Sequence, residues 1–452
     1  MRVNEAVELT RLCRKHPKVD DRSSAKIEGA ALRMDQRLGA RNAFYTADLI
    51  VALEHVDEVA RTLDRFGVVF ADADRSEGLG LARVEVQDDR VAAATLGDAV
   101  LGELRAQGRP TPGWTATTDM DRVLAALRTH FAEQYAGWTP TLGKNRLVGH
   151  VVGGGGKISF GGGPGLRATE VRPQPRQQSP GHGVKVGVLD SSISAHPWLA
   201  GGWVSPFHDV LGEADGTHAV AGHATFVTGL VLSQAPACTV DVRGVLSDVD
   251  GESDSWTVAK EIVALGRDHV DVLNLSFVCY TEDGQPPLVL ATAIDRLDAR
   301  TVVVAAAGNH GDPATAATPD DCRKPGWPAA LDDVIAVGAA HPGGEAAVFT
   351  PADAAWIDVL APGVEVVSTY LTGRVDLRHE VATPTFEQFD GFAVWSGTSF
   401  ASALVSGAIA ARTRPGFSAR EAWAELRGPR GARSRPPFLD LHGVLYDAQP
   451  GT

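Results

Sequence analysis

The chain has 452 residues, of which 44% are hydrophobic, so it can bury at least one large core within two or three domains. Its formal net charge of -14 argues against nucleic acid or an anionic membrane surface as the main partner, because both attract surplus Lys and Arg. The four cysteines, Cys13, Cys238, Cys279 and Cys322, show no CxxC or closely spaced Cys/His pattern. They therefore indicate neither a zinc site nor a disulfide framework.

The N-terminal segment alternates charged residues with short apolar patches and lacks the apolar stretch of a secretory signal. No run of about 18 apolar residues occurs anywhere in the sequence, so no membrane-spanning helix is predicted. We therefore expect a cytoplasmic protein. Residues 1–43 are polar and charged and are interpreted as an N-terminal arm.

Residues 44–148 have the pattern of a small α+β region. A strand pattern at 46–54 precedes an amphipathic helix that ends on a glycine, and a second strand and a second glycine-terminated helix follow up to residue 108. A further helix is predicted over residues 118–136. Residues 149–182 are rich in Gly and then in Pro and Gln, which is typical of a flexible linker.

From residue 183 to 452 the pattern changes to short apolar runs separated by helical segments. The runs VKVGVLD, TVDVRGVL, DVLNLSF, TVVVAAAG, DVIAVGA and AWIDVLAPG each read as a strand buried on both faces. Strands that alternate with helices predict an α/β fold with a doubly wound parallel sheet and helices on both faces. In such sheets the ligand crevice lies at the carboxyl ends of the strands.

Three residues that could carry out peptide hydrolysis lie at element ends facing that crevice. Asp190 ends the first strand, His223 opens a helix, and Ser399 follows a glycine-bearing turn that enters a buried helix. A serine nucleophile needs a base for its proton and a carboxylate that orients the base. Asn309, just beyond another strand end, is predicted to bond the oxyanion together with the backbone N–H of Ser399.

The chain order Asp, His, Ser resembles that of the subtilisin-like serine peptidases, the subtilase family. Seven segments resemble subtilase motifs in the right order between residue 184 and about 430: VGVLDSSISAHP, GHATFVTG, SWTVAKEIVALGRDHVDVLNLS, VVVAAAGNHG, GWPAALDDVIAVGA, DVLAPG and SGTSFASALVSG. The resemblance implies a subtilisin-like peptidase domain and a serine endopeptidase that works through an acyl-enzyme. It implies a protein or peptide substrate and no cofactor.

The resemblance also implies two strand-like segments that pair with the substrate backbone. The residues that match them are Leu275 and Ser276 on one edge, Ala306, Ala307 and Gly308 on a pocket wall, and Glu252, Ser253 and Asp254 on the opposite edge. Because Asp250, Glu252 and Asp254 are acidic, we expect a basic side chain upstream of the cut; the alternative is a solvated acidic turn.

Three positions depart from the family pattern. Ser192 and Val278 stand where a glycine is usual, and Ala403 stands where a proline is usual. Val278 is expected to reshape the first pocket. Ala403 suggests a peptide ligase or cyclase as an alternative function, because it lies close to the nucleophile and could alter how water competes with amines.

The N-terminal α+β region resembles the propeptides of this family in topology, so it is expected to act as an intramolecular inhibitor or, alternatively, as an accessory domain. If it is a propeptide, self-cleavage would fall within residues 149–182. A third possible function is a catalytically silent binding module whose cleft the N-terminal region occupies. No D-x-[DN]-x-[DN]-G loop is present, so no metal site is predicted.

Overall fold

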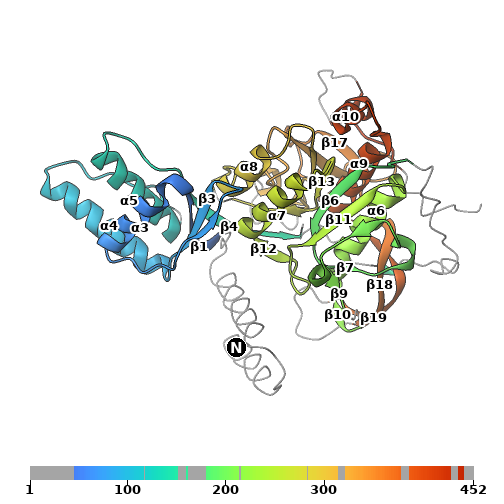
Figure 1. Ribbon diagram of the computed structural model, residues 1–452, viewed down its shortest axis with the longest axis horizontal. Helices are drawn as coiled ribbons and strands as arrows, with labels where there is room; N and C mark the ends of the chain where they lie inside the picture. Colours follow the sequence, from blue (N-terminus) through green and yellow to red (C-terminus); the bar gives the residue numbers. More distant parts are fainter. Residues whose placement is uncertain are drawn as a thin grey trace, which may run out of the picture.

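The computed structural model describes residues 45–116, 118–150, 159–160, 180–212, 215–281, 283–313, 321–377, 386–428 and 436–441. The expected arm at 1–43 and most of the expected linker at 149–182 lie outside these residues. The described residues form a larger unit built on a parallel sheet and a smaller unit whose helices lie at one end of the molecule (Figure 1).

Seven strands form the central sheet of the larger unit, in the order β17-β16-β15-β13-β6-β11-β8, and all neighbours pair in parallel. The strands are β6 Lys185–Asp190, β8 Trp203–Val204, β11 Thr239–Gly244, β13 Val272–Leu275, β15 Val302–Ala306, β16 Val334–Ala340 and β17 Val359–Pro362. Six of them are the buried apolar runs of the sequence. The predicted α/β parallel-sheet fold is confirmed.

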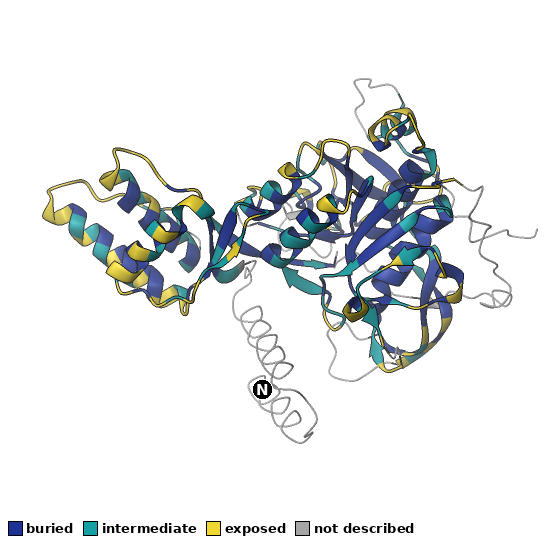
Figure 2. Cartoon of the chain, viewed as in Figure 1, coloured by how far each residue is buried: buried dark blue, intermediate teal, exposed yellow. Residues whose placement is uncertain are grey.

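Helices cover both faces of this sheet. Successive side chains of each strand point to opposite sides, and because these side chains are apolar on both sides, each face packs against helices. Val302 and Val304 belong to one buried core with the helices α6 and α9, whereas Val303 and Ala305 belong to a second core with α7 and α8. The helices of this unit are α6 His223–Gln234, α7 Ser255–Arg267, α8 Leu288–Asp295, α9 Thr398–Arg412 and α10 Ala419–Arg427. Figure 2 shows the buried residues concentrated in this sheet and its flanking helices.

The smaller unit has its own core between a sheet and three helices. Its elements are β1 Tyr45–Ala52, α3 Val56–Arg65, β2 Asp74–Ser76, β3 Leu81–Glu85, α4 Asp89–Ala106, α5 Asp119–Gln134 and β4 Leu142–His150. Side chains fix the helix starts: Asp88 accepts from the N–H of Val91, and Thr118 and Asp121 form a capping box. The predicted strand-helix alternation is therefore present in this region.

Strand β4 joins the two units into one sheet. Its first half pairs with β1, and its last residues pair antiparallel with β12 (Glu252–Asp254) on one side and with β14 (Phe277–Val278) on the other. The partners are Leu147 with Asp254, Val148 with Ser253, and Gly149 with both Glu252 and Val278. The sequence assigns Gly149 and His150 to the linker, whereas the structure has them as the last residues of β4.

The larger unit also contains two smaller sheets, and several 3-10 turns occur along the chain. A four-stranded sheet runs β10-β18-β19-β5, and a two-stranded sheet pairs β7 with β9. Their bounds are β5 Ser159–Phe160, β7 Ile193–Ser194, β9 Val210–Leu211, β10 Thr217–His218, β18 Val366–Asp376 and β19 Phe386–Trp395. The 3-10 turns are η1 Leu53–His55, η3 Pro197–Leu199, η4 Phe207–Asp209, η5 Ala219–Gly222 and η6 Asp321–Arg323. Among the described residues, no helix has the length and apolarity needed to cross a membrane.

Candidate active site

Asp190 ends β6 at the carboxyl edge of the central sheet, and its side chain is completely buried. Its carboxylate accepts hydrogen bonds from the backbone N–H of Ser191, at 2.7 Å, and from the imidazoles of His223 and His150. Burial raises the pKa of Asp190, but the electrostatic interaction with His223 and the hydrogen bonds from both histidines outweigh burial and hold that pKa well below its usual range. Asp190 is therefore a carboxylate that remains ionised inside the protein.

His223 is the first residue of α6, and its Nδ1 lies 2.8 Å from both carboxylate oxygens of Asp190. A carboxylate partner places the ring proton on Nδ1, so Nε2 keeps the lone pair that a general base needs. The backbone before His223 is tightly packed, since a Cβ on Gly222 would collide with the ring of Tyr370. The Phe400 ring lies 5.4 Å from that of His223, which places the base beside the start of α9.

Ser399 is the second residue of α9 and is 3% exposed. Its hydroxyl donates to the backbone carbonyl of Ser276, at 3.2 Å, and not to His223. Ser276 in turn donates to the backbone carbonyl of Ser399 at 3.0 Å, so the two residues hold each other. The N-terminus of a 15-residue helix places backbone N–H groups and a partial positive charge at this hydroxyl.

Asn309 is tied to the same helix start through Thr398. Its side-chain oxygen accepts from both the backbone N–H and the hydroxyl of Thr398, each at 3.0 Å, and that hydroxyl accepts from the backbone N–H of Gly308 at 3.1 Å. Because the oxygen is used in this way, the orientation of the amide group is fixed. The structure thus brings Asn309 and Ser399 to one helix end.

The other predicted site residues divide between the strand segments next to β4 and the core. Glu252, Ser253 and Asp254 form β12, an edge that pairs with β4. Leu275 ends β13 inside the sheet and contributes its side chain to the core, and on that side β4 pairs with the residues of β14, which follow Ser276. Ala306 ends β15 and is followed by Ala307 and Gly308, all three buried next to the start of α9.

Asp254, one of the acidic residues in and next to β12, has a structural role. Both oxygens of Asp254 accept hydrogen bonds at the start of α7, from the N–H groups of Trp256 and Thr257 and from the Thr257 hydroxyl. Asp254 is thus a helix cap. Asp250 is exposed, and Glu252, like Asp254, is partly exposed.

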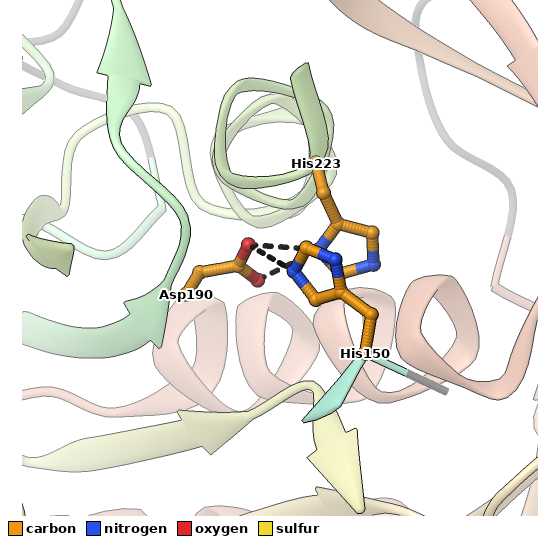
Figure 3. Close-up of side chains that lie close together, drawn as sticks. All are labelled: His150, Asp190 and His223. Atoms are coloured by element: carbon orange, nitrogen blue, oxygen red, sulfur yellow. Dashed lines mark hydrogen bonds and ion pairs between the residues drawn. The ribbon is translucent and has the colours of Figure 1, made fainter. Parts of the chain in front are cut away.

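His150, which sequence reasoning missed, completes the cluster at Asp190. Its Nε2 lies 3.2 Å from the Asp190 carboxylate, and its ring lies 4.1 Å from the His223 ring at an angle of 31° (Figure 3). The strand backbone fixes it there, because the His150 N–H donates to the carbonyl of Gly251 at 2.9 Å. One signal was available: a strand-compatible run, KNRLVGH, reaches His150, which two residues separate from the start of the glycine run.

These elements define a subtilisin-like α/β protein with an Asp-His pair at the sheet edge and a serine at a helix start. A family model described as the subtilase family matches residues 181–427, more than half of the chain, and the chain belongs to that family. Subtilisin E of Bacillus subtilis (strain 168) is 31% identical over 243 residues, which cover 51% of this chain and 55% of that protein. A subtilisin of Bacillus pumilus is also 31% identical over 243 residues and is covered to 76%.

The chain therefore spans little more than half the length of subtilisin E. Among solved structures, the protease domain of PatA shares 22% identity with a TM-score of 0.46, over 59% of this chain and 95% of that one.

Proposed function

We propose that this protein is a serine endopeptidase in which Ser399 attacks the peptide carbonyl, His223 moves the proton and Asp190 orients His223. The observation that carries this proposal is the Nδ1 contact of His223 with both oxygens of a buried, ionised Asp190, beside the helix start that bears Ser399. Membership of the subtilase family supports it.

In the first half of the reaction, the Ser399 hydroxyl rotates from the Ser276 carbonyl toward Nε2 of His223 and gives up its proton as Oγ bonds to the carbonyl carbon. The resulting oxyanion is stabilised by the Ser399 N–H and the amide of Asn309. The C–N bond then breaks, and His223 returns the proton to the leaving amine. Water, deprotonated by the same imidazole, hydrolyses the acyl-enzyme and regenerates Ser399.

We further propose that the N-terminal unit is an intramolecular inhibitor. Its strand β4 pairs with β12, which is one edge expected to bind substrate, and with β14, which directly follows the other expected edge at Leu275 and Ser276. The space between β12 and β14 that β4 fills is called the groove. Main-chain pairing of this kind is how an extended peptide adds to a sheet edge. Val148 is 1% exposed and shares a buried cluster with Trp256 and Val258, so side-chain burial adds to the pairing.

Self-cleavage is expected on the C-terminal side of His150, because the strand up to that residue is docked as a substrate would be. Intact-mass measurements on wild type beside Ser399→Ala test this. We expect a Ser399-dependent cut between His150 and His182; a chain that remains whole, or a cut that also appears in the variant, contradicts the proposal.

We also propose that the enzyme acts on one dedicated substrate and prefers a basic residue near the cut. The acidic side chains of Asp250 and Glu252 support this preference. Profiling cleavage of a peptide library by wild type and by Glu252→Gln tests it. We expect Lys or Arg to be favoured upstream of the cut, and less so in the variant. Equal cleavage of peptides with and without basic residues contradicts it.

The occupied groove also favours a second candidate, a catalytically silent binding module. Products of one test peptide, with and without an added amine, separate the possibilities. Hydrolysed peptide supports the endopeptidase, and a product joined to the amine supports the ligase or cyclase that Ala403 suggests. No product from folded protein whose groove has been opened by substitution in β4 supports the silent module.

A further inference from the structure

Three buried side chains from three segments far apart in the sequence converge at the end of β4. His150 comes from β4, Asp190 from β6 and His223 from α6. One nitrogen or oxygen atom of each lies within 4.8 Å of the others, and the residues are 6%, 0% and 3% exposed. Figure 3 shows both imidazoles facing the one carboxylate.

Two imidazole nitrogens and one carboxylate oxygen form a ligand set suited to zinc. Zinc sites with three protein ligands of this kind keep a fourth position for water, with bonds of about 2.0–2.2 Å. Tetrahedral bonds of that length separate ligand atoms by about 3.3 Å. Here the Asp190 oxygen lies 2.8 Å from Nδ1 of His223 and 3.2 Å from Nε2 of His150. The two oxygen-to-nitrogen distances therefore need to lengthen by up to about half an ångström, and the two nitrogens lie within 4.8 Å of each other.

We propose that a divalent transition-metal ion, with Zn²⁺ as its best-fitting member, binds to Nε2 of His150, the Asp190 carboxylate and Nδ1 of His223 in the chain whose β4 is docked. The ion takes the place of the two N–H···O contacts. It needs the lone pairs of Nδ1 and Nε2, so each ring proton shifts to the other nitrogen of its own ring. Both imidazoles remain neutral, Asp190 remains ionised, and no net proton is released.

The ion would hold β4 in place and would also prevent His223 from acting as a base. The effect on His223 rests on the proposed function. With metal on Nδ1, the proton of His223 lies on Nε2, which then has no lone pair to accept the Ser399 proton. The site loses a ligand when β4 leaves, because His150 is on that strand. Binding only to the docked state lowers the population of the open state, by about 100-fold at an ion concentration 100 times the dissociation constant.

The position of His150 depends on Gly251, on the loop that leads into β12. Gly251 has a φ of 72°, and a Cβ there would collide with the His150 ring. The absence of a side chain at Gly251 leaves room for the imidazole to lie over His223. The ligands are 40 and 33 residues apart along the chain, which is why no closely spaced motif reveals the site.

Calorimetric titration of the full-length Ser399→Ala chain with Zn²⁺ tests the proposal without requiring any peptidase activity. We expect one equivalent to bind and the midpoint of thermal unfolding to rise. Adding His150→Asn is expected to weaken binding by at least ~100-fold, since even the partners of metal ligands contribute 10- to 100-fold. His208→Ala is the matched control, because His208 is exposed and its Nε2 also lies 3.2 Å from an aspartate, Asp209.

Absorption of Co²⁺ in the same protein identifies the ligands even if His150→Asn unfolds. A tetrahedral nitrogen and oxygen spectrum supports the proposal. A thiolate charge-transfer band would assign the metal to one or more of the four cysteines of the chain and overturn it. Absence of binding, or equal affinity in folded His150→Asn, also overturns it. Zinc binding to the Ser399→Ala chain, together with no peptide cleavage by metal-free protein that retains Ser399 and has β4 displaced by substitution, would leave this site standing while refuting the proposed function.

Discussion

Substitution of Val148 tests whether β4 controls access to Ser399. The Val148 side chain is 1% exposed in the groove. Removing two of its carbons in Val148→Ala costs about 1.5 kcal/mol of docking free energy. Val148→Asp loses that burial and adds an unpaired carboxylate to an apolar cluster, for a total of more than about 3 kcal/mol.

The rate at which a fluorophosphonate labels Ser399 measures the population of the state in which β4 is undocked, provided that β4 docks and undocks faster than the probe reacts. We expect labelling to be about tenfold faster in Val148→Ala and more than about a hundredfold faster in Val148→Asp. Val91→Asp serves as the control, because Val91 is 59% exposed on α4 of the same unit. The reasoning is refuted if folded Val148 variants are labelled at the wild-type rate, or if Val91→Asp is accelerated equally.

Three further predictions concern single side chains. Asn309→Ala is expected to lower kcat by about 10²- to 10³-fold with little change in KM, because it removes an oxyanion donor; steady-state kinetics with a loss below tenfold would contradict this. Gly251→Ala is expected to displace His150 and accelerate labelling, whereas Gly216→Ala, at a φ of 80° with no atom near the new Cβ, is expected to leave labelling unchanged. Burial lowers the pKa of His196 to about 4. As the pH falls from 7 to 4, the unfolded chain, with a His pKa of about 6.5, is protonated first, so the free energy of unfolding falls by on the order of 3 kcal/mol. Urea unfolding at both pH values measures this: in His196→Asn the free energy of unfolding is expected to fall less between pH 7 and pH 4 than in wild type. The same decrease in both proteins would contradict the role given to His196.

The sequence predicted the central sheet because its strands are short apolar runs buried on both faces, a pattern that requires no knowledge of their partners. Asp190, His223 and Ser399 could be identified for a related reason. Each lies at the end of an element within a recognisable local segment, and the carboxyl ends of parallel strands converge at one edge.

The docking of β4 could not be predicted in the same way. It depends on pairing with β12 and β14, more than 100 residues further along the chain, and a glycine run that begins three residues after His150 hides the end of the strand. The role of Asp254 as a cap was similarly hidden in an acidic turn, although an Asp directly before a helical pattern is a cap signal.

Peptide mapping of the fluorophosphonate adduct tests most directly whether Ser399 is an activated nucleophile. In Val148→Asp, where β4 no longer blocks the groove, we expect one adduct, located on Ser399. The adduct should be lost when His223→Ala is added, although Ser399 itself is retained. Folded Val148→Asp protein with no adduct on Ser399, or labelling that does not depend on His223, would contradict the account.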